Sequence, residues 1–157
     1  MGLDMYLYIG NTFSKYSPVD GNDKVKSVAK MLNAEDFIKE DGIQFANVKL
    51  QVAYWRKSNA VHQYFVDTCA EGKDECQEIY VGLENLEDLK NRCEKILENH
   101  DLASELLPTQ SGFFFGSTEY DEYYFKDLKD TIKQITPVIE RLKDKNCMWD
   151  VYYQASW

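Results

Sequence analysis

Hydrophobic residues alternate with polar residues or tyrosines at both ends of this 157-residue chain, over residues 3–8 and 149–157. A period of two places successive side chains on opposite faces of an extended strand. Each segment therefore predicts a strand with one apolar face and one polar or aromatic face. The residues on the predicted apolar faces are Leu3, Met5, Leu7, Val151, Tyr153, Ala155 and Trp157.

The segments between these ends predict further strands and helices. Short runs rich in β-branched and aromatic residues favour strands, whereas apolar residues that recur every three or four positions favour helices. Together with the terminal segments, the predicted strands cover residues 3–8, 47–54, 76–81, 112–115 and 149–157. The predicted helices cover residues 58–69, 83–97, 101–107 and 118–142. This order predicts an α+β fold, with three main helices packed on a mostly antiparallel or mixed sheet of about five strands.

The length of the chain suits one domain with a single hydrophobic core. Residues 11–47 are its least regular part, because turn residues separate short amphipathic pieces there. The start of the chain lacks the basic residues and the continuous apolar run of a secretory signal, and no segment has the length and apolarity needed to span a bilayer. We therefore expect a single α+β domain over residues 1–157, located in the cytoplasm and without membrane association.

The cysteine and charge content argues against several classes of function. The four cysteines form no C-x-x-C pair and have no histidine at ligand spacing, so we interpret them as small hydrophobic residues and expect no metal or other cofactor. The formal net charge of -9 repels phosphate backbones and argues against general nucleic-acid binding. It still allows a local cationic pocket, or an acidic surface that binds a basic protein.

Residues 54–62 combine cationic and amide side chains with an indole at a predicted strand-to-helix junction. The guanidinium of Arg56, with Lys57 beside it, matches the geometry of a phosphate or carboxylate, and the helix start adds backbone N–H groups. Trp55 precedes this pair and Asn59 follows it on the predicted helix. We interpret the junction as a binding site for a flat, polar and anionic small molecule.

His62 lies on the same side of that predicted helix as Asn59. The ordinary pKa of an imidazole would let it contact a ligand or act as a general base. Structural roles are the alternatives for these groups: His62 could be a hydrogen-bonded core residue, and Arg56 could pair with a carboxylate such as Asp4 or Asp121.

Residues 108–117 form a second candidate wall, in which a hydroxyl- and amide-rich loop leads into three phenylalanines. Such side chains can hydrogen-bond a base edge, a ribose or a phosphate, and nearby tyrosines could stack a base at about 1–3 kcal/mol each. The candidate ligand-binding residues outside the junction are Thr109, Gln110, Ser111, Phe113, Tyr120, Tyr124 and Tyr152. We expect residues 54–62 and 108–117 to face each other across a hollow that solvent can reach.

Four motifs together resemble a widespread group of small phage and prophage proteins. They are Gly-Leu-Asp-Met-Tyr-Leu at residues 2–7, Tyr-Trp-Arg-Lys-x-Asn-x-x-His at 54–62, Leu-Pro-Thr-Gln-Ser-Gly-Phe-Phe-Phe-Gly at 107–116, and Tyr-Tyr-Gln-Ala-Ser-Trp at 152–157. The resemblance covers most of the chain outside residues 11–47 and brings no reaction with it. It implies a viral origin and a protein made in the host cytoplasm during infection.

Small phage proteins of this kind include sponges for nucleotide immune signals and blockers of host nucleases, an analogy that leaves three hypotheses. The first is a non-catalytic pocket protein that sequesters a nucleotide-like signal. The second is a hydrolase or phosphodiesterase acting on a similar molecule, with His62 as the base. The third is an acidic protein that inhibits a host defence nuclease. The aromatic and cationic character of the distinctive residues favours the first, and a homodimer could complete the pocket across a two-fold axis.

Overall fold

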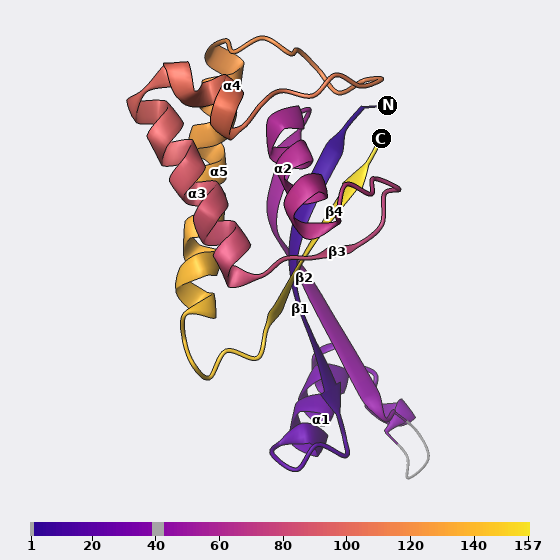
Figure 1. The fold of residues 1–157 in the computed structure, drawn as a ribbon. Coiled ribbons are helices and arrows are strands. Elements are labelled where there is room, and N and C mark those ends of the chain that lie inside the picture. Colours follow the sequence, from indigo (N-terminus) through magenta and orange to yellow (C-terminus); the bar gives the residue numbers. More distant parts are fainter. Residues whose placement is uncertain (1, 39–42) are drawn as a thin grey trace. The chain divides into compact units, whose positions relative to one another are not determined.

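The computed structural model describes residues 2–38 and 43–157. The chain divides into two compact units, of which Gly10–Leu50 is the smaller, and Met1–Ile9 together with Gln51–Trp157 is the larger. The elements follow one another in the order β1, α1, β2, α2, β3, α3, α4, α5 and β4 (Figure 1). The first and second strands each contribute residues to both units.

The bounds of the elements agree with most of the predicted segments. The strands are β1 (Asp4–Ser14), β2 (Phe45–Arg56), β3 (Ile79–Tyr80) and β4 (Asp150–Ser156). The α-helices are α1 (Gly21–Met31), α2 (Asn59–Cys69), α3 (Leu83–Glu98), α4 (Ala103–Leu106) and α5 (Glu122–Leu142). Short 3-10 helices cover Glu35–Phe37 and His100–Leu102.

The four strands form one sheet in the order β2-β1-β4-β3. Strand β3 pairs antiparallel with β4, so that Ile79 lies opposite Tyr153 and Tyr80 opposite Tyr152. The prediction of an α+β fold with an antiparallel sheet is therefore confirmed. Strand β2 lies at one edge of the sheet and β3 at the other.

The period-two alternation divides the residues of the sheet between two faces. Side chains of one face are buried, namely those of Leu3, Met5, Leu7, Ala53, Trp55, Ile79, Val151, Tyr153 and Ala155. The other face carries half-buried or exposed side chains, namely those of Asp4, Tyr6, Tyr8, Tyr54, Arg56, Tyr80, Tyr152 and Gln154. Trp157 departs from the prediction, because it follows the end of β4, is exposed and donates from its indole N–H to Asp74.

Helices α2, α3 and α5 contribute to the same core as the buried face of the sheet. The ring of Phe65 in α2 stacks on Tyr153 with centroids 4.3 Å apart. The indole N–H of Trp55 donates to the hydroxyl of Thr131 in α5 at 2.9 Å. Burial of each large apolar side chain stabilises the fold by about 1.5–3 kcal/mol, so this core explains why the helices pack on one face of the sheet.

Two details of the predicted architecture are wrong. The sheet has four strands instead of about five in the described residues, because residues 112–115 form a turn. The amide of Phe115 donates to the carbonyl of Gly112, and Phe114 has a φ of 70°, which interrupts an extended chain. The described α-helices number five, because residues 11–47 include helix α1.

The smaller unit, Gly10–Leu50, contains the continuation of β1, helix α1 and the first half of β2. The hydroxyl of Thr12 donates to the side-chain oxygen of Asn47 at 2.7 Å, which links the two strands. Val25 and Ala29 are buried on the inner side of α1. The amphipathic pieces expected here are thus helix α1 and the 3-10 turn, whereas residues 39–42 lie outside the described part of the chain.

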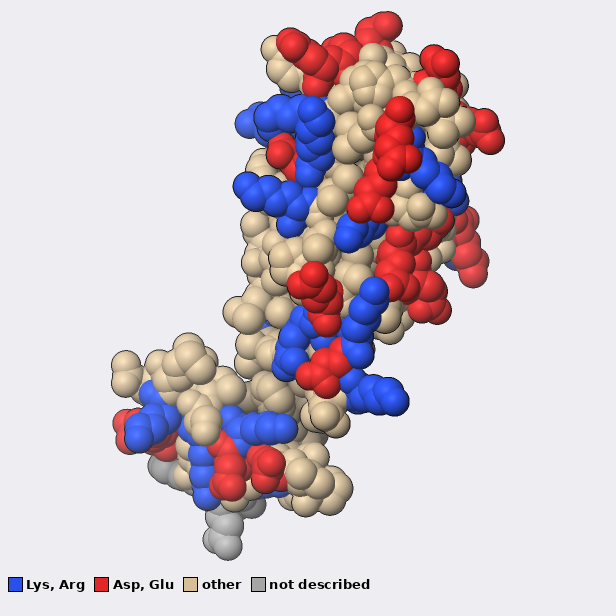
Figure 2. Space-filling view, turned by 90° about the vertical axis from the view of Figure 1, so that its left-hand side faces the viewer, with Lys and Arg blue, Asp and Glu red and all other residues tan. Residues whose placement is uncertain are grey.

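The described surface mixes acidic and basic side chains. Figure 2 shows both signs interspersed over the face that it presents, without a continuous basic tract. A site for a nucleic-acid backbone would need such a tract, since affinity for it depends on neutralising phosphates. Among the helices of the described residues, none has the length and apolar character needed to cross a membrane.

Candidate functional site

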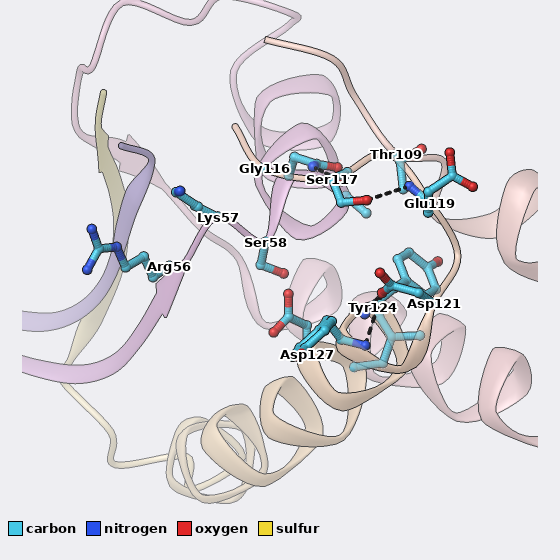
Figure 3. A pocket seen from close by; sticks show the side chains of 14 residues that line it. Arg56, Lys57, Ser58, Thr109, Gly116, Ser117, Glu119, Asp121, Tyr124 and Asp127 are labelled. Carbon is cyan, nitrogen blue, oxygen red and sulfur yellow. Dashed lines mark hydrogen bonds between the residues drawn. The ribbon is translucent and has the colours of Figure 1, made fainter. Parts of the chain in front are cut away.

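A cavity of about 290 Å³ lies where the end of β2, the start of α2, the loop after α4 and the first turns of α5 meet (Figure 3). Its wall includes Arg56, Lys57, Ser58, Asn59, Ala60, Thr109, Gly116, Ser117, Glu119, Asp121, Tyr123, Tyr124, Asp127 and Leu128. The two segments expected to face each other therefore both contribute to one cavity. Five of the twelve candidate residues line it, namely Arg56, Lys57, Asn59, Thr109 and Tyr124.

The turn from β2 into α2 depends on two unusual backbone conformations. Lys57 has a φ of 60°, and its amide donates to the carbonyl of Leu3 at 2.8 Å, which keeps the turn against β1. Gly116 has a φ of 95°, and a Cβ at this position would lie 3.0 Å from the Cβ of Lys57. Glycine is therefore required at position 116 for both its φ and its close approach to the turn.

Asn59 is the residue that attaches the loop to α2. Its buried side chain donates to the carbonyls of Phe115 (3.1 Å) and Ser117 (2.9 Å), and accepts from the amide of Gln110 (3.0 Å). Three of its hydrogen-bonding positions are thus used within the protein. Asn59 forms part of the cavity wall, but its main effect is to place the loop residues around it.

The triple phenylalanine folds back on itself instead of presenting a flat aromatic wall. Phe115 is buried, and its ring meets the imidazole of His62 edge-on with centroids 5.3 Å apart. A Cβ on Gly112 would lie 2.5 Å from the Phe115 ring, so this glycine allows the ring to pack under the loop. Phe113 points outward with 85% of its side chain exposed and does not line the cavity.

His62 is a structural residue in this fold. It is 1% exposed and lies outside the cavity wall. One hydrogen bond of 2.7 Å joins its Nδ1 to the hydroxyl of Tyr153, and another of 3.0 Å joins its Nε2 to the carboxylate of Asp74. Because both ring nitrogens have protein partners, the imidazole is not available to a ligand in the cavity.

The other predicted residues lie around the cavity or away from it. Trp55 is buried in the core below the junction. Gln110 contributes its backbone amide to Asn59, Ser111 is exposed in the loop, and the hydroxyl of Tyr120 accepts from the amide of Thr109 at 3.4 Å. Tyr152 lies on the opposite face of the sheet, where its ring meets that of Tyr80 with centroids 6.1 Å apart.

Charges are divided across the cavity. Figure 3 shows the side chains of Arg56 and Lys57 extending away from Ser58 at one rim, whereas Glu119, Asp121 and Asp127 lie on the other side of Ser58. The guanidinium of Arg56 is largely exposed, with its Nε 4.0 Å from a carboxylate oxygen of Asp4, which is a weak surface pair. Arg56 therefore keeps most of its capacity to bind an anion at the rim.

The carboxylates of the opposite side differ in their surroundings. Asp121 caps α5, since it accepts from the amides of Tyr123 (3.0 Å) and Tyr124 (3.1 Å). Partial burial raises the pKa of Asp127, and a hydrogen bond from Ser58 opposes that rise. Burial also raises the pKa of Tyr124, whose hydroxyl donates to the carbonyl of Leu107. Tyr124 therefore presents an un-ionised ring to the cavity.

Sequence reasoning missed the acidic part of the wall. The segment 118–121 resembles a helix start, and Asp121 is indeed the N-cap, but its position in the cavity depends on where α5 packs. Asp127 follows Tyr124 by three residues and so lies on the same side of the helix. That spacing is the one signal that could have identified Asp127 once Tyr124 was a candidate.

The arrangement suits a ligand that is anionic at one end and rich in hydrogen-bond donors at the other. Arg56 and Lys57 can attract an anionic group at the rim, whereas Asp121 and Asp127 accept hydrogen bonds from hydroxyl or amino groups. No protein-family model, curated protein or solved structure matches this chain. The resemblance to phage proteins therefore rests on the sequence motifs alone.

Proposed function

We propose that this protein sequesters a small nucleotide-like molecule in the cavity between β2, α2 and α5, and that it does so without converting the ligand. The observation that carries the proposal is the separation of charge along the cavity wall, with Arg56 and Lys57 at one rim and Glu119, Asp121 and Asp127 on the other side. A nucleotide has the matching division, because its phosphate is anionic whereas its sugar and base carry hydroxyl and amino donors.

Each part of such a ligand has a matching side chain in the wall of the cavity. The phosphate would lie at the rim, where the fork of Arg56 can bind two of its oxygens. Ribose hydroxyls or an amino group would donate to Asp127 and Asp121. The exposed ring of Tyr123 lines the same cavity and offers a surface on which a base can stack.

The size of the cavity limits what can be enclosed. At about 290 Å³ it lies near the lower end of ligand pockets, which span roughly 300–1,000 Å³. It would enclose about one nucleoside, so a larger signal such as a cyclic dinucleotide would extend beyond the rim. Binding is favoured over turnover because His62, the predicted base, has both nitrogens engaged in the core.

The proposal is tested by calorimetry and thermal shift with a panel of nucleoside monophosphates and cyclic nucleotides. A ligand of the proposed class raises the melting temperature, by an amount that grows with the logarithm of its concentration above the Kd, and is recovered chemically unchanged after heat release. Arg56→Ala is expected to weaken binding by about 10- to 100-fold, since one charge-assisted hydrogen bond contributes roughly 1.5–3 kcal/mol.

Arg141→Ala is the matched control, because Arg141 is also an exposed arginine but pairs with Asp144 at the end of α5. This variant should bind like the wild type. An altered ligand after release would identify the protein as an enzyme. Absence of any thermal shift across the panel would remove the nucleotide proposal.

A further inference from the structure

A groove of about 620 Å³ runs between the outer edge of β2 and helix α5. Strand β2 is an edge strand of the sheet, so one side of its backbone has no neighbouring strand. The residues that matter most here are Val52, Tyr54 and Arg56 from the strand, and Lys133 and Gln134 from the helix. Free strand edges are templates for the addition of another strand.

The direction of the backbone groups follows from one hydrogen bond. The amide of Tyr54 donates across the groove to the side-chain oxygen of Gln134 at 2.9 Å, so this N–H points away from β1. Backbone groups of a strand alternate in direction with a period of two. The amides and carbonyls of Val52 and Arg56 therefore point into the groove as well, whereas the amide of Lys57 points to the carbonyl of Leu3, just before β1.

We propose that this groove binds an extended acidic peptide of a protein partner, which adds to β2 as a further strand. Main-chain hydrogen bonds to Val52, Tyr54 and Arg56 would hold the peptide, and a peptide carbonyl would replace Gln134 at the amide of Tyr54. This site and the nucleotide cavity share Arg56, but the inference does not depend on the proposed function.

The charged side chains of the groove favour an acidic peptide. Lys126 is neutralised by Asp130 at 2.5 Å, whereas no ion pair joins Lys133 to any of the residues that the structure describes. The side chain of Arg56 is 60% exposed. With the Lys126–Asp130 pair set aside, the groove is lined by Arg56, Lys133 and the partly buried Asp127, so its net charge is positive. The exposed ends of Arg56 and Lys133 favour carboxylates on the added strand.

The position of α5 argues for a single peptide strand instead of a second copy of this chain. If two β2 edges paired, each would bring its own α5 along its outer side, and each helix would obstruct the other sheet. A lone extended segment needs only the width of one strand. Its alternate side chains would face Tyr54 and Lys133.

The experiment is selection from a random heptapeptide display library on the purified protein, followed by titration of the selected peptides. Acidic peptides should be enriched, and hydrogen exchange should slow at the amides of Val52 and Arg56 when they bind. N-methylation of the peptide should abolish binding at alternate positions only, because only those amides face β2.

Lys133→Glu should weaken the selected peptides about five-fold or more, while Lys129→Glu, an exposed position of α5 outside the groove, should leave their affinity unchanged. Enrichment of no peptide, or protection elsewhere, would overturn the proposal. So would concentration-dependent protection of Val52 and Arg56 without peptide, which would indicate a dimer through this edge. None of these outcomes bears on nucleotide binding, which Lys133→Glu should not alter.

Discussion

Asn59→Asp is the substitution that best tests how the cavity is built. The two side chains have nearly the same shape, but the carboxylate replaces the amide donor with an acceptor. That acceptor would face the carbonyl oxygens of Phe115 and Ser117, which the amide now approaches at 3.1 and 2.9 Å. The hydrogen bond from the amide of Gln110 would remain, since it ends on the oxygen of the side chain.

The expected cost follows from these contacts. Two hydrogen bonds are lost at about 0.5–1.5 kcal/mol each, and buried acceptors without donors add about 1–3 kcal/mol. We expect a loss of about 3 kcal/mol in the free energy of unfolding, which for a chain of this length lowers the melting temperature by about 6–12 °C. The loop would also detach from α2, so ligand affinity should fall.

The pH dependence of this variant has a defined sign. Burial and the two carbonyls favour the protonated carboxyl, so its pKa is higher in the folded than in the unfolded state. The loss in the free energy of unfolding is therefore largest at neutral pH. It shrinks as the pH falls through that raised pKa, because a protonated carboxyl can donate one hydrogen bond. Melting curves by circular dichroism at pH 7 and pH 4 measure both effects.

Asn91→Asp provides the control, because Asn91 is exposed on α3 and the same change of charge should shift the melting temperature little. A melting temperature of Asn59→Asp within about 1 °C of the wild type at pH 7 would refute the assignment of Asn59 as the anchor of the loop.

Three further predictions concern buried polar groups. Tyr153→Phe should lower the free energy of unfolding, measured by heat or urea, by about 1–2 kcal/mol, because it leaves His62 without one hydrogen-bond partner. Tyr152→Phe, on the other face of the sheet, should lower it little. Equal effects would contradict the assignment of the two faces. Burial raises the pKa of Asp127, so its ionised form destabilises the fold at pH 7 and this penalty is relieved as the pH falls through the raised pKa. Asp127→Asn should therefore raise the melting temperature at pH 7 and lose that gain near pH 3, and a gain that persists at low pH would exclude this cause. Burial raises the pKa of Cys93 to about 12, so iodoacetamide at pH 8 should spare it until the protein unfolds, and peptide mapping that finds early alkylation would show an open core.

Local sequence patterns were sufficient to predict most of the larger unit. The alternation at residues 3–8 and 149–157 predicted strands, and their inner residues are buried, except for Trp157. The helical spacing over residues 58–69 and 83–97 matches α2 and α3 within one residue at each end. These predictions succeed because hydrophobic periodicity reflects which side of an element is buried.

The site was less predictable, because its residues meet through contacts that are distant in sequence. Phe113, Phe114 and Phe115 form a short apolar run that fits a strand equally well, but Asn59 holds the segment as a turn from more than 50 positions away. His62 was a candidate base until the fold placed Tyr153, 91 positions later, against its ring.

The sequence by itself determined most of the strands and helices of the larger unit, which of their faces are buried, and that Arg56 and Lys57 lie at a strand-to-helix junction. Only the tertiary structure decided that Asp121 and Asp127 oppose this pair, and that the free edge of β2 faces Lys133. The physical reason is that periodicity depends on neighbours within a few positions, whereas the charge of a cavity depends on how α5 packs against β2. Among 27 acidic residues, no local pattern distinguishes those that face the cavity.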